Sequence, residues 1–217
     1  MKNIILILFT LLAIKDINAQ KTWNQNTSGI PSSVAINEFA IVGDDLYAAG
    51  NFMDYKTFTF EIRLYKSSKN GLNWKQVETK GLKMLTGNAL FNSKGKLFMS
   101  GVIIQAPMEF SIYSSEDNGL TWSYNTSGIP SSVAINEFAI VGDDLYAAGN
   151  FIDNKTFTFE IRLYKSSDNG LNWKQVETNG LELLTGNALF NFKGKLFMSG
   201  TIVQAPMEFS IYNSAVD

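Results

Sequence analysis

The stretch SGIPSSVAINEFAIVGDDLYAAGNF, residues 28 to 52, returns without a change at residues 127 to 151. The similarity extends on both sides, because Trp23 to Ser115 align without a gap on Trp122 to Ser214, with 81 of 93 positions identical. Such self-similarity indicates a repeat architecture, in which each unit buries its apolar face against its neighbours. We therefore expect two copies, residues 23–121 and 122–217, within one domain spanning residues 20–217.

A shorter period lies inside each copy. The four tryptophans stand at positions 23, 74, 122 and 173, so the intervals are 51, 48 and 51 residues, in the range of a propeller blade. The first unit divides into four short expected strands, at residues 35–42, 46–50, 57–67 and 73–78. No stretch of the mature chain carries a capped apolar helical period. The sequence predicts an all-β fold, a β-propeller of about four four-stranded antiparallel blades built from two near-identical two-blade repeats.

The hairpin before each later tryptophan has a common pattern, Ser-x-Asp-x-Gly-x-Thr-Trp. The third hairpin matches it fully, and the fourth has Asn172 in place of Thr. The second has Asn73 in place of Thr and also Lys69 where the Asp belongs. The pattern residues are Gly71, Trp74, Ser115, Asp117, Gly119, Thr121, Trp122, Ser166, Asp168, Gly170 and Trp173. This pattern resembles the Asp-box, or bacterial neuraminidase repeat, which implies a sialidase-like β-propeller.

The chemistry of the pattern favours a structural role. Asp and Ser side chains hydrogen-bond the backbone of a tight turn, Gly supplies a positive φ, and Trp buries a large face with an N–H available for a partner. Lys69 agrees with this interpretation, because that hairpin has lost its Asp while it keeps Gly71 and Trp74. We therefore expect the repeated Asp residues to hold turns and not to bind ligands.

Closure of the ring is expected to use the N-terminal strand. Residues 21–25 resemble a fourth strand without its own blade, and residues 208–214 resemble a third strand without a fourth. Pairing of the two would complete the last blade and cover an edge that otherwise invites aggregation. Propellers of the resembled family usually have more than four blades, so three assemblies stay open: a four-bladed monomer, a larger ring made by a homodimer, and a truncated chain.

The first 19 residues are typical of a signal peptide. Lys2 precedes an apolar run from Ile4 to Ile14, and Ala19 suits signal peptidase. Eleven apolar residues are too few for a membrane span, which needs about 20. We expect a secreted, cell-surface or periplasmic protein with no membrane span after cleavage; an uncut N-terminal anchor is the alternative.

Charge and composition narrow the possible partners and chemistry. Removal of residues 1–19 changes the formal charge from -2 to -3, and an acidic body is a poor ligand for nucleic acid or an anionic membrane. The chain has no Cys and no His, so disulfides, thiolate zinc sites and histidine bases are excluded. We expect no cofactor and no metal, and any catalysis would depend on carboxylates, Tyr, Lys or Ser.

The resemblance implies sialidase activity, but the residues do not support it. Sialidases hold a carboxylate with three arginines, whereas this chain has only Arg63 and Arg162, at equivalent repeat positions. A two-carboxylate glycoside hydrolase is harder to exclude, because Glu38, Glu137 and loop aspartates are present. Every such acid is duplicated and none is distinguished by its context, so no catalytic residue is assigned.

Candidate binding residues lie in loops that we expect to be exposed, between second and third strands and at blade crossovers. They are Phe52, Asp54, Tyr55, Met108, Phe151, Asp153 and Met207. Apolar side chains on exposed loops can mark a binding surface, or they can fold back over the blades. Glu61 with Arg63, and Glu160 with Arg162, are expected to form structural ion pairs between sheets.

Taken together, the sequence favours a secreted, non-enzymatic β-propeller that binds or scaffolds an extracellular protein or glycan. The alternatives are a sialidase-like or other glycan-cleaving hydrolase, and a truncated propeller fragment without function.

Overall fold

The computed structural model describes residues 25–26, 28–68, 71–103, 109–153, 155–156, 158–202 and 208–214. In these ranges the regular structure consists of strands alone, in antiparallel pairs. No helix in the described part is long and apolar enough to cross a membrane. The expected signal peptide and most of the expected N-terminal strand, residues 21–24, lie outside the described residues.

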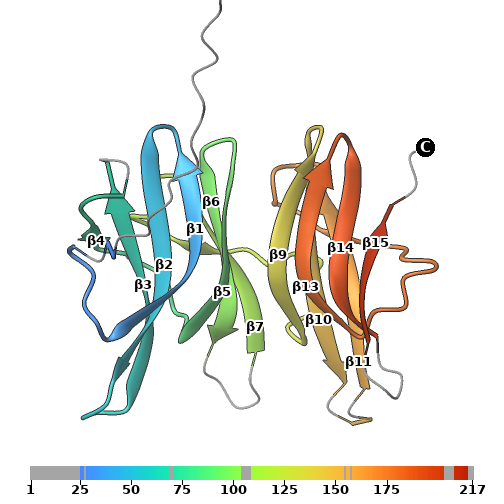
Figure 1. The fold of residues 1–217 in the computed structure, drawn as a ribbon, viewed down its shortest axis with the longest axis horizontal. Helices are drawn as coiled ribbons and strands as arrows, with labels where there is room; N and C mark the ends of the chain where they lie inside the picture. Colours follow the sequence, from blue (N-terminus) through green and yellow to red (C-terminus); the bar gives the residue numbers. More distant parts are fainter. Residues whose placement is uncertain are drawn as a thin grey trace, which may run out of the picture.

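The strands form four sheets, each of which we call a blade (Figure 1). Blade 1 consists of β1 (Val34–Val42), β2 (Asp45–Asp54), β3 (Thr59–Ser67) and β4 (Lys75–Val77). Blade 2 consists of β5 (Thr86–Ser93), β6 (Lys96–Ile103), β7 (Glu109–Ser115) and β8 (Ser123–Tyr124). Blade 3 consists of β9 (Val133–Val141), β10 (Asp144–Asp153), β11 (Thr158–Ser166) and β12 (Lys174–Val176). Blade 4 consists of β13 (Thr185–Phe192), β14 (Lys195–Ile202) and β15 (Glu208–Asn213).

The first strands of the blades pack against one another in chain order, β1 on β5, β5 on β9 and β9 on β13. Figure 1 shows blade 1 at one side of the molecule and blade 4 at the other, with these first strands toward the middle. Face-to-face sheets around a shared centre are the arrangement of a propeller.

An apolar core fills each junction between neighbouring blades. Tyr47 and Leu64 lie in the core between blades 1 and 2 with Trp122. Phe98 and Phe138 lie in the core between blades 2 and 3, and Leu163 contributes to the core between blades 3 and 4. Inner strands contribute most to these cores: six consecutive residues of β6 are buried, whereas both residues of the outer strand β8 are exposed.

A bulge in the first strand of a blade links it to the next blade. The pairing of β1 with β2 shifts register between Ile36 and Glu38, which leaves Asn37 unpaired in the ladder. The Asn37 side chain donates to the Gly87 carbonyl over 3.1 Å, and the Gly87 N–H donates to Asn51 Oδ1 over 2.9 Å. The second copy repeats these bonds around Gly186. The bulge thus provides a polar link between two sheets.

The expectation of four four-stranded blades is met in three sheets only. Among the described residues, blade 4 has three strands, and no fourth strand pairs with β15. The outward side chains Phe39 of blade 1 and Ile211 of blade 4 are both exposed. The described strands therefore form four successive blades without a closed ring.

Candidate functional site

The hairpin between β7 and β8 is held by its own side chains. Asp117 accepts hydrogen bonds from the Thr121 N–H at 2.8 Å and the Thr121 hydroxyl at 2.5 Å, and from the Ser115 hydroxyl at 2.8 Å. The Gly119 N–H donates to Ser115 Oγ, and the buried Trp122 indole donates to the Gly119 carbonyl, both over 2.8 Å. These hydrogen bonds, that of the Thr121 hydroxyl first, lower the pKa of Asp117 to about 2. The carboxylate is committed to the turn.

The hairpin between β11 and β12 has the same construction. Asp168 accepts from Ser166 Oγ at 2.7 Å and from the Asn172 N–H at 2.9 Å, and Asn172 Nδ2 takes the place of the Thr hydroxyl at 2.8 Å. The Asn172 hydrogen bonds lower the pKa of Asp168 to about 2. Lys69 of the first hairpin lies outside the described residues, whereas Gly71 adopts a φ of 78° and Trp74 is buried.

Two of the predicted binding residues, Phe52 and Phe151, lie beneath arginines. The Arg63 guanidinium carbon stands 3.3 Å from the centre of the Phe52 ring, and Arg63 Nε lies 2.6 Å from Glu61 Oε1. Arg162 lies over Phe151 in the same way, at 3.5 Å. The expected Glu–Arg ion pairs therefore form within one strand, β3 or β11, and not between sheets, because residues two apart in a strand share a face.

The remaining loop candidates are dispersed. Asp54 and Asp153 end β2 and β10, where each accepts the N–H of a Lys two residues on over 2.8 Å. That backbone hydrogen bond lowers the pKa of each carboxyl. Tyr55 is 71% exposed and has no described counterpart, and Met108 and Met207 lie outside the described residues. The binding role of this set stays a prediction.

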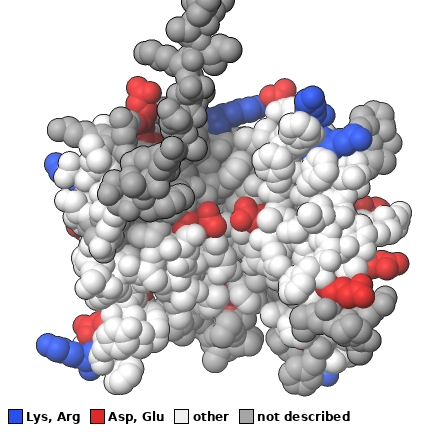
Figure 2. Space-filling view, in the orientation of Figure 1, with Lys and Arg blue, Asp and Glu red and all other residues white. Residues whose placement is uncertain are grey.

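Two glutamates from the first strands of blades 1 and 3 do interact. Glu38 and Glu137 follow the bulges of β1 and β9, and both side chains are half-buried. Burial raises the pKa of Glu137 to about 7, and the negative charge of Glu38 adds to this effect. Burial also raises the pKa of Glu38. Figure 2 shows acidic side chains near the middle of the face in view. Near neutral pH the Glu137 carboxyl can therefore donate a hydrogen bond as well as accept one.

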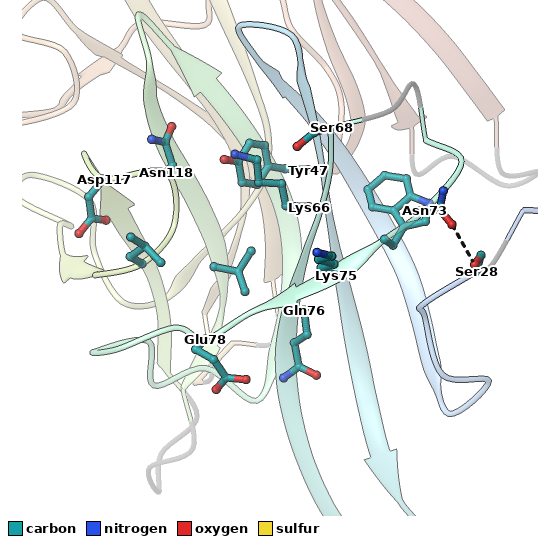
Figure 3. A pocket seen from close by; sticks show the side chains of 13 residues that line it. Ser28, Tyr47, Lys66, Ser68, Asn73, Lys75, Gln76, Glu78, Asp117 and Asn118 are labelled. Carbon is teal, nitrogen blue, oxygen red and sulfur yellow. Dashed lines mark hydrogen bonds between the residues drawn. The ribbon is translucent and has the colours of Figure 1, made fainter.

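A groove of about 890 Å³ lies at the rim, between β3 and β4 of blade 1 and the hairpin of blade 2. Figure 3 shows Asp117 and Asn118 on one side, with Tyr47 and Lys66 between them and Asn73. The Lys66 ammonium lies 2.7 Å from Asp45, and this hydrogen bond raises the pKa of Lys66. Because Tyr47 and Trp74 are buried, the groove offers no open aromatic face on which a ligand could stack.

No group of three or more His, Cys, Asp or Glu side chains in the described part of the chain could hold a metal ion. The glutamate pair and the rim groove are two arrangements in the described residues with possible binding chemistry for a small ligand. The sequence named Glu38 and Glu137 as possible hydrolase carboxylates but did not distinguish them from other acids, and it did not indicate the groove, which joins parts of two blades.

Comparison with known proteins gives a fold and no sequence family. No family model and no curated protein sequence matches the chain. Among solved structures, the α-L-arabinanase of Penicillium chrysogenum is similar at a TM-score of 0.59 and 15% identity, over 86% of this chain and 64% of that one. A Hadza microbial sialidase is similar at 0.57 and 15%, over 77% of this chain and 40% of that one. The chain has a sialidase-like β-propeller fold.

A protein of unknown function from Dyadobacter fermentans has the same propeller likeness, at a TM-score of 0.58 and 14% identity, over 81% of this chain and 59% of that one. This propeller chain thus spans less than two thirds of these three structures. The expected sialidase-like β-propeller fold is confirmed, and the finer assignment to the Asp-box family stays a prediction.

Proposed function

We propose that this protein is a secreted β-propeller module that binds a neutral glycan over Glu38 and Glu137. The observation that carries the proposal is the pair of half-buried glutamates at equivalent positions of blades 1 and 3, where burial and the charge of Glu38 raise the pKa of Glu137 to about 7. A sugar hydroxyl both donates and accepts hydrogen bonds. A carboxyl group accepts hydrogen bonds in either state and donates one when it is protonated, so a glutamate with a raised pKa can offer both partners.

The arginines favour a neutral ligand over an acidic one. Arg63 and Arg162 are the only arginines of the chain, and each guanidinium lies on a Phe ring and pairs with a Glu of its own strand. Arginine is the side chain that best matches a carboxylate, through two parallel hydrogen bonds. With both guanidinium groups engaged, a sialic acid carboxylate lacks its usual partner.

Binding of glycans by the signal-free chain tests this proposal. The wild type is screened against neutral and sialylated oligosaccharides at pH 6 to 7, and any ligand found is titrated against the double variant Glu38→Gln, Glu137→Gln. We expect neutral ligands to be preferred and the double variant to bind at least about 10-fold more weakly, because a charge-assisted hydrogen bond is lost. Glu78→Gln, the same chemical change in the rim groove, is the matched control and should bind as the wild type does.

Two results would contradict the proposal. Equal loss of affinity in Glu78→Gln and in the double variant would move the site to the rim groove. Retained affinity in the double variant would remove the glutamate pair from binding.

A second function, glycan hydrolysis, is favoured by one observation. Two carboxyl groups that interact, one of them protonated near neutral pH, are the pair required for general acid and base steps at a glycosidic bond. Turnover of neutral fluorogenic glycosides that is abolished by Glu137→Gln would replace the binding function by hydrolysis. Absence of turnover together with glycan binding would support the module as proposed.

A further inference from the structure

Strands of identical sequence lie in different surroundings in this chain. β1 and β9 share the sequence VAINEFAIV, yet Phe39 is 59% exposed and its counterpart Phe138 only 3%. Ile211 of β15 is 75% exposed, whereas its counterpart Ile112 of β7 is 1% exposed. Each exposed residue belongs to an end blade, which has a neighbouring described blade on one side only, so the difference reflects position and not sequence.

The junction between blades 2 and 3 shows what such faces contact. Its core comprises Ala89, Phe98, Ile112, Ile129, Val133, Ile135, Phe138, Leu145, Ala147, Tyr164 and Trp173. The first three belong to blade 2 and have identical counterparts on blade 4, namely Ala188, Phe197 and Ile211. The other eight belong to blade 3 or to the segment leading into it, and their identical counterparts at blade 1 are Ile30, Val34, Ile36, Phe39, Leu46, Ala48, Tyr65 and Trp74. The chain therefore carries both halves of this core a second time, on opposite ends.

The half on blade 1 is hollow. A cavity of about 680 Å³ lies on its outward face, lined by Val34, Ile36, Phe39 and Trp74 among others. At the equivalent place on blade 3, the rings of Phe91 and Phe98 stand 5.8 and 6.1 Å from the Phe138 ring. The hollow has the apolar lining that receives two Phe rings in the other copy.

We propose that a second copy of this chain occupies this face, with its blade 4 seated on blade 1 of the first copy. Phe190, Phe197 and Ile211 of the second copy would contact Phe39, as Phe91, Phe98 and Ile112 share a core with Phe138. The packing is head to tail, because the two faces belong to different blades. It is independent of the proposed glycan site.

Polar groups agree with this pairing. Lys94 Nζ of blade 2 lies 2.8 Å from Asp143 Oδ1 of blade 3, and the counterparts are Lys193 and Asp44. One position differs: Ser93, which is buried and donates to Asn169 Oδ1 over 3.0 Å, is replaced by Phe192, so the proposed pairing has no equivalent of this hydrogen bond. This replacement adds an apolar side chain, 53% exposed, to the outward side of blade 4.

The arrangement within one chain favours a second copy over self-closure. On the blade 1 face Val34, Ala48, Tyr65 and Trp74 are buried in a cluster of their own, whereas Phe39 and Ile41 remain exposed. On blade 4 Phe209 and Ile211 remain exposed, so neither face covers the other. Contiguous apolar faces of this kind on a sheet are typical of interaction sites.

Complementary variants test the pairing in the signal-free chain. Ile41→Glu places a charge on the blade 1 face and Ile211→Glu on the blade 4 face, each at a residue at least 62% exposed. We expect sedimentation to show a dimer or larger species for the wild type and monomers for each variant, with about a 100-fold weaker self-association because a carboxylate would be buried unpaired. An equimolar mixture of the two variants should form dimers, since one intact face of each kind remains. Leu120→Glu, at an exposed site away from both faces, is the matched control and should associate as the wild type does.

Cross-linking separates a second copy from closure within one chain. The chain has no Cys, so Asp44→Cys with Lys193→Cys introduces the only thiols, and a short bis-maleimide should join them between copies and double the mass. Asp143→Cys with Lys94→Cys is the internal control and should cross-link without a change in mass. A monomeric wild type, a mixture of variants that stays monomeric, or a cross-link of the end pair within one chain would each overturn the proposal.

Discussion

Gly119 and Gly95 form a matched pair for measuring how tightly the blades pack. Both have a φ of 85°, so replacement by Ala imposes the same backbone strain at each position. They differ in surroundings: a Cβ at Gly119 would overlap the side chain of Leu64, which is fully buried in blade 1, whereas nothing lies within 4 Å of a Cβ at Gly95. The hydrogen bonds made by the two N–H groups survive both substitutions.

The strain alone is expected to cost about 1 kcal/mol, so Gly95→Ala should lower the free energy of unfolding by that amount. Gly119→Ala should cost about 2–4 kcal/mol, because forcing a methyl group into a packed core adds about 1–3 kcal/mol. Urea denaturation followed by tryptophan fluorescence measures both, with the slope of the transition as a check that the unfolded states are comparable. Equal losses in the two variants would refute the inference that this hairpin packs closely against the preceding blade.

Three further predictions concern the hairpins and the glutamate pair. Trp122→Ala should lower the free energy of unfolding by about 3–5 kcal/mol in thermal or urea denaturation, because its ring is buried between blades 1 and 2. Burial raises the pKa of Glu137 from 4.5 to about 7, so between these pH values the native state keeps a proton that the unfolded state has lost. The free energy of unfolding should therefore fall as pH rises through this interval, by about 1 kcal/mol for a half-buried, solvent-screened carboxyl. Urea denaturation at pH 4 and pH 8 measures the difference, and Glu137→Gln should remove it. Hydrogen bonds lower the pKa of Asp117 and of Asp168 from 3.8 to about 2, so their contribution to the free energy of unfolding is complete above pH 3.8 and is lost as pH falls through 2. Asp117→Asn should therefore reduce the loss of stability between pH 4 and pH 2. An unchanged loss of stability in this variant would contradict the hydrogen bonds described.

Much of the fold could be predicted because the repeat and the strand alternation are local signals. The expected strand at residues 35–42 is found as Val34–Val42, and the tight turns coincide with Gly43 and Gly95 at positive φ. The ends of the fourth strand differ from the expectation. The strand expected at residues 73–78 is found as Lys75–Val77, because a fourth strand lies at the outer edge of its blade and pairs on one side.

The sequence named the two glutamates of the candidate site among its acids but could not pair them, because their pairing depends on how blades meet. Glu38 and Glu137 occupy the same position in two copies, and sequence alone does not show that both approach one centre. The stacking of Arg63 on Phe52 follows from the pairing of β3 with β2, which places Phe52 opposite Glu61. The exposure of Phe39 could not be predicted from the local sequence, because Phe138 in the same nonapeptide of blade 3 is buried.

The contrast between β6 and β14 has a consequence for how the molecule opens. The two strands differ at one residue, Val102 or Thr201, yet six residues of β6 are buried and only two of β14. Local opening is easiest where few side chains are covered, so amide protons of β14 and β15 should exchange with solvent sooner than those of β6 and β7. In a monomeric chain, local unfolding would then begin at blade 4 before it reaches blade 2. The nearly identical strands β6 and β7 serve as the internal reference for the exchange rates of β14 and β15.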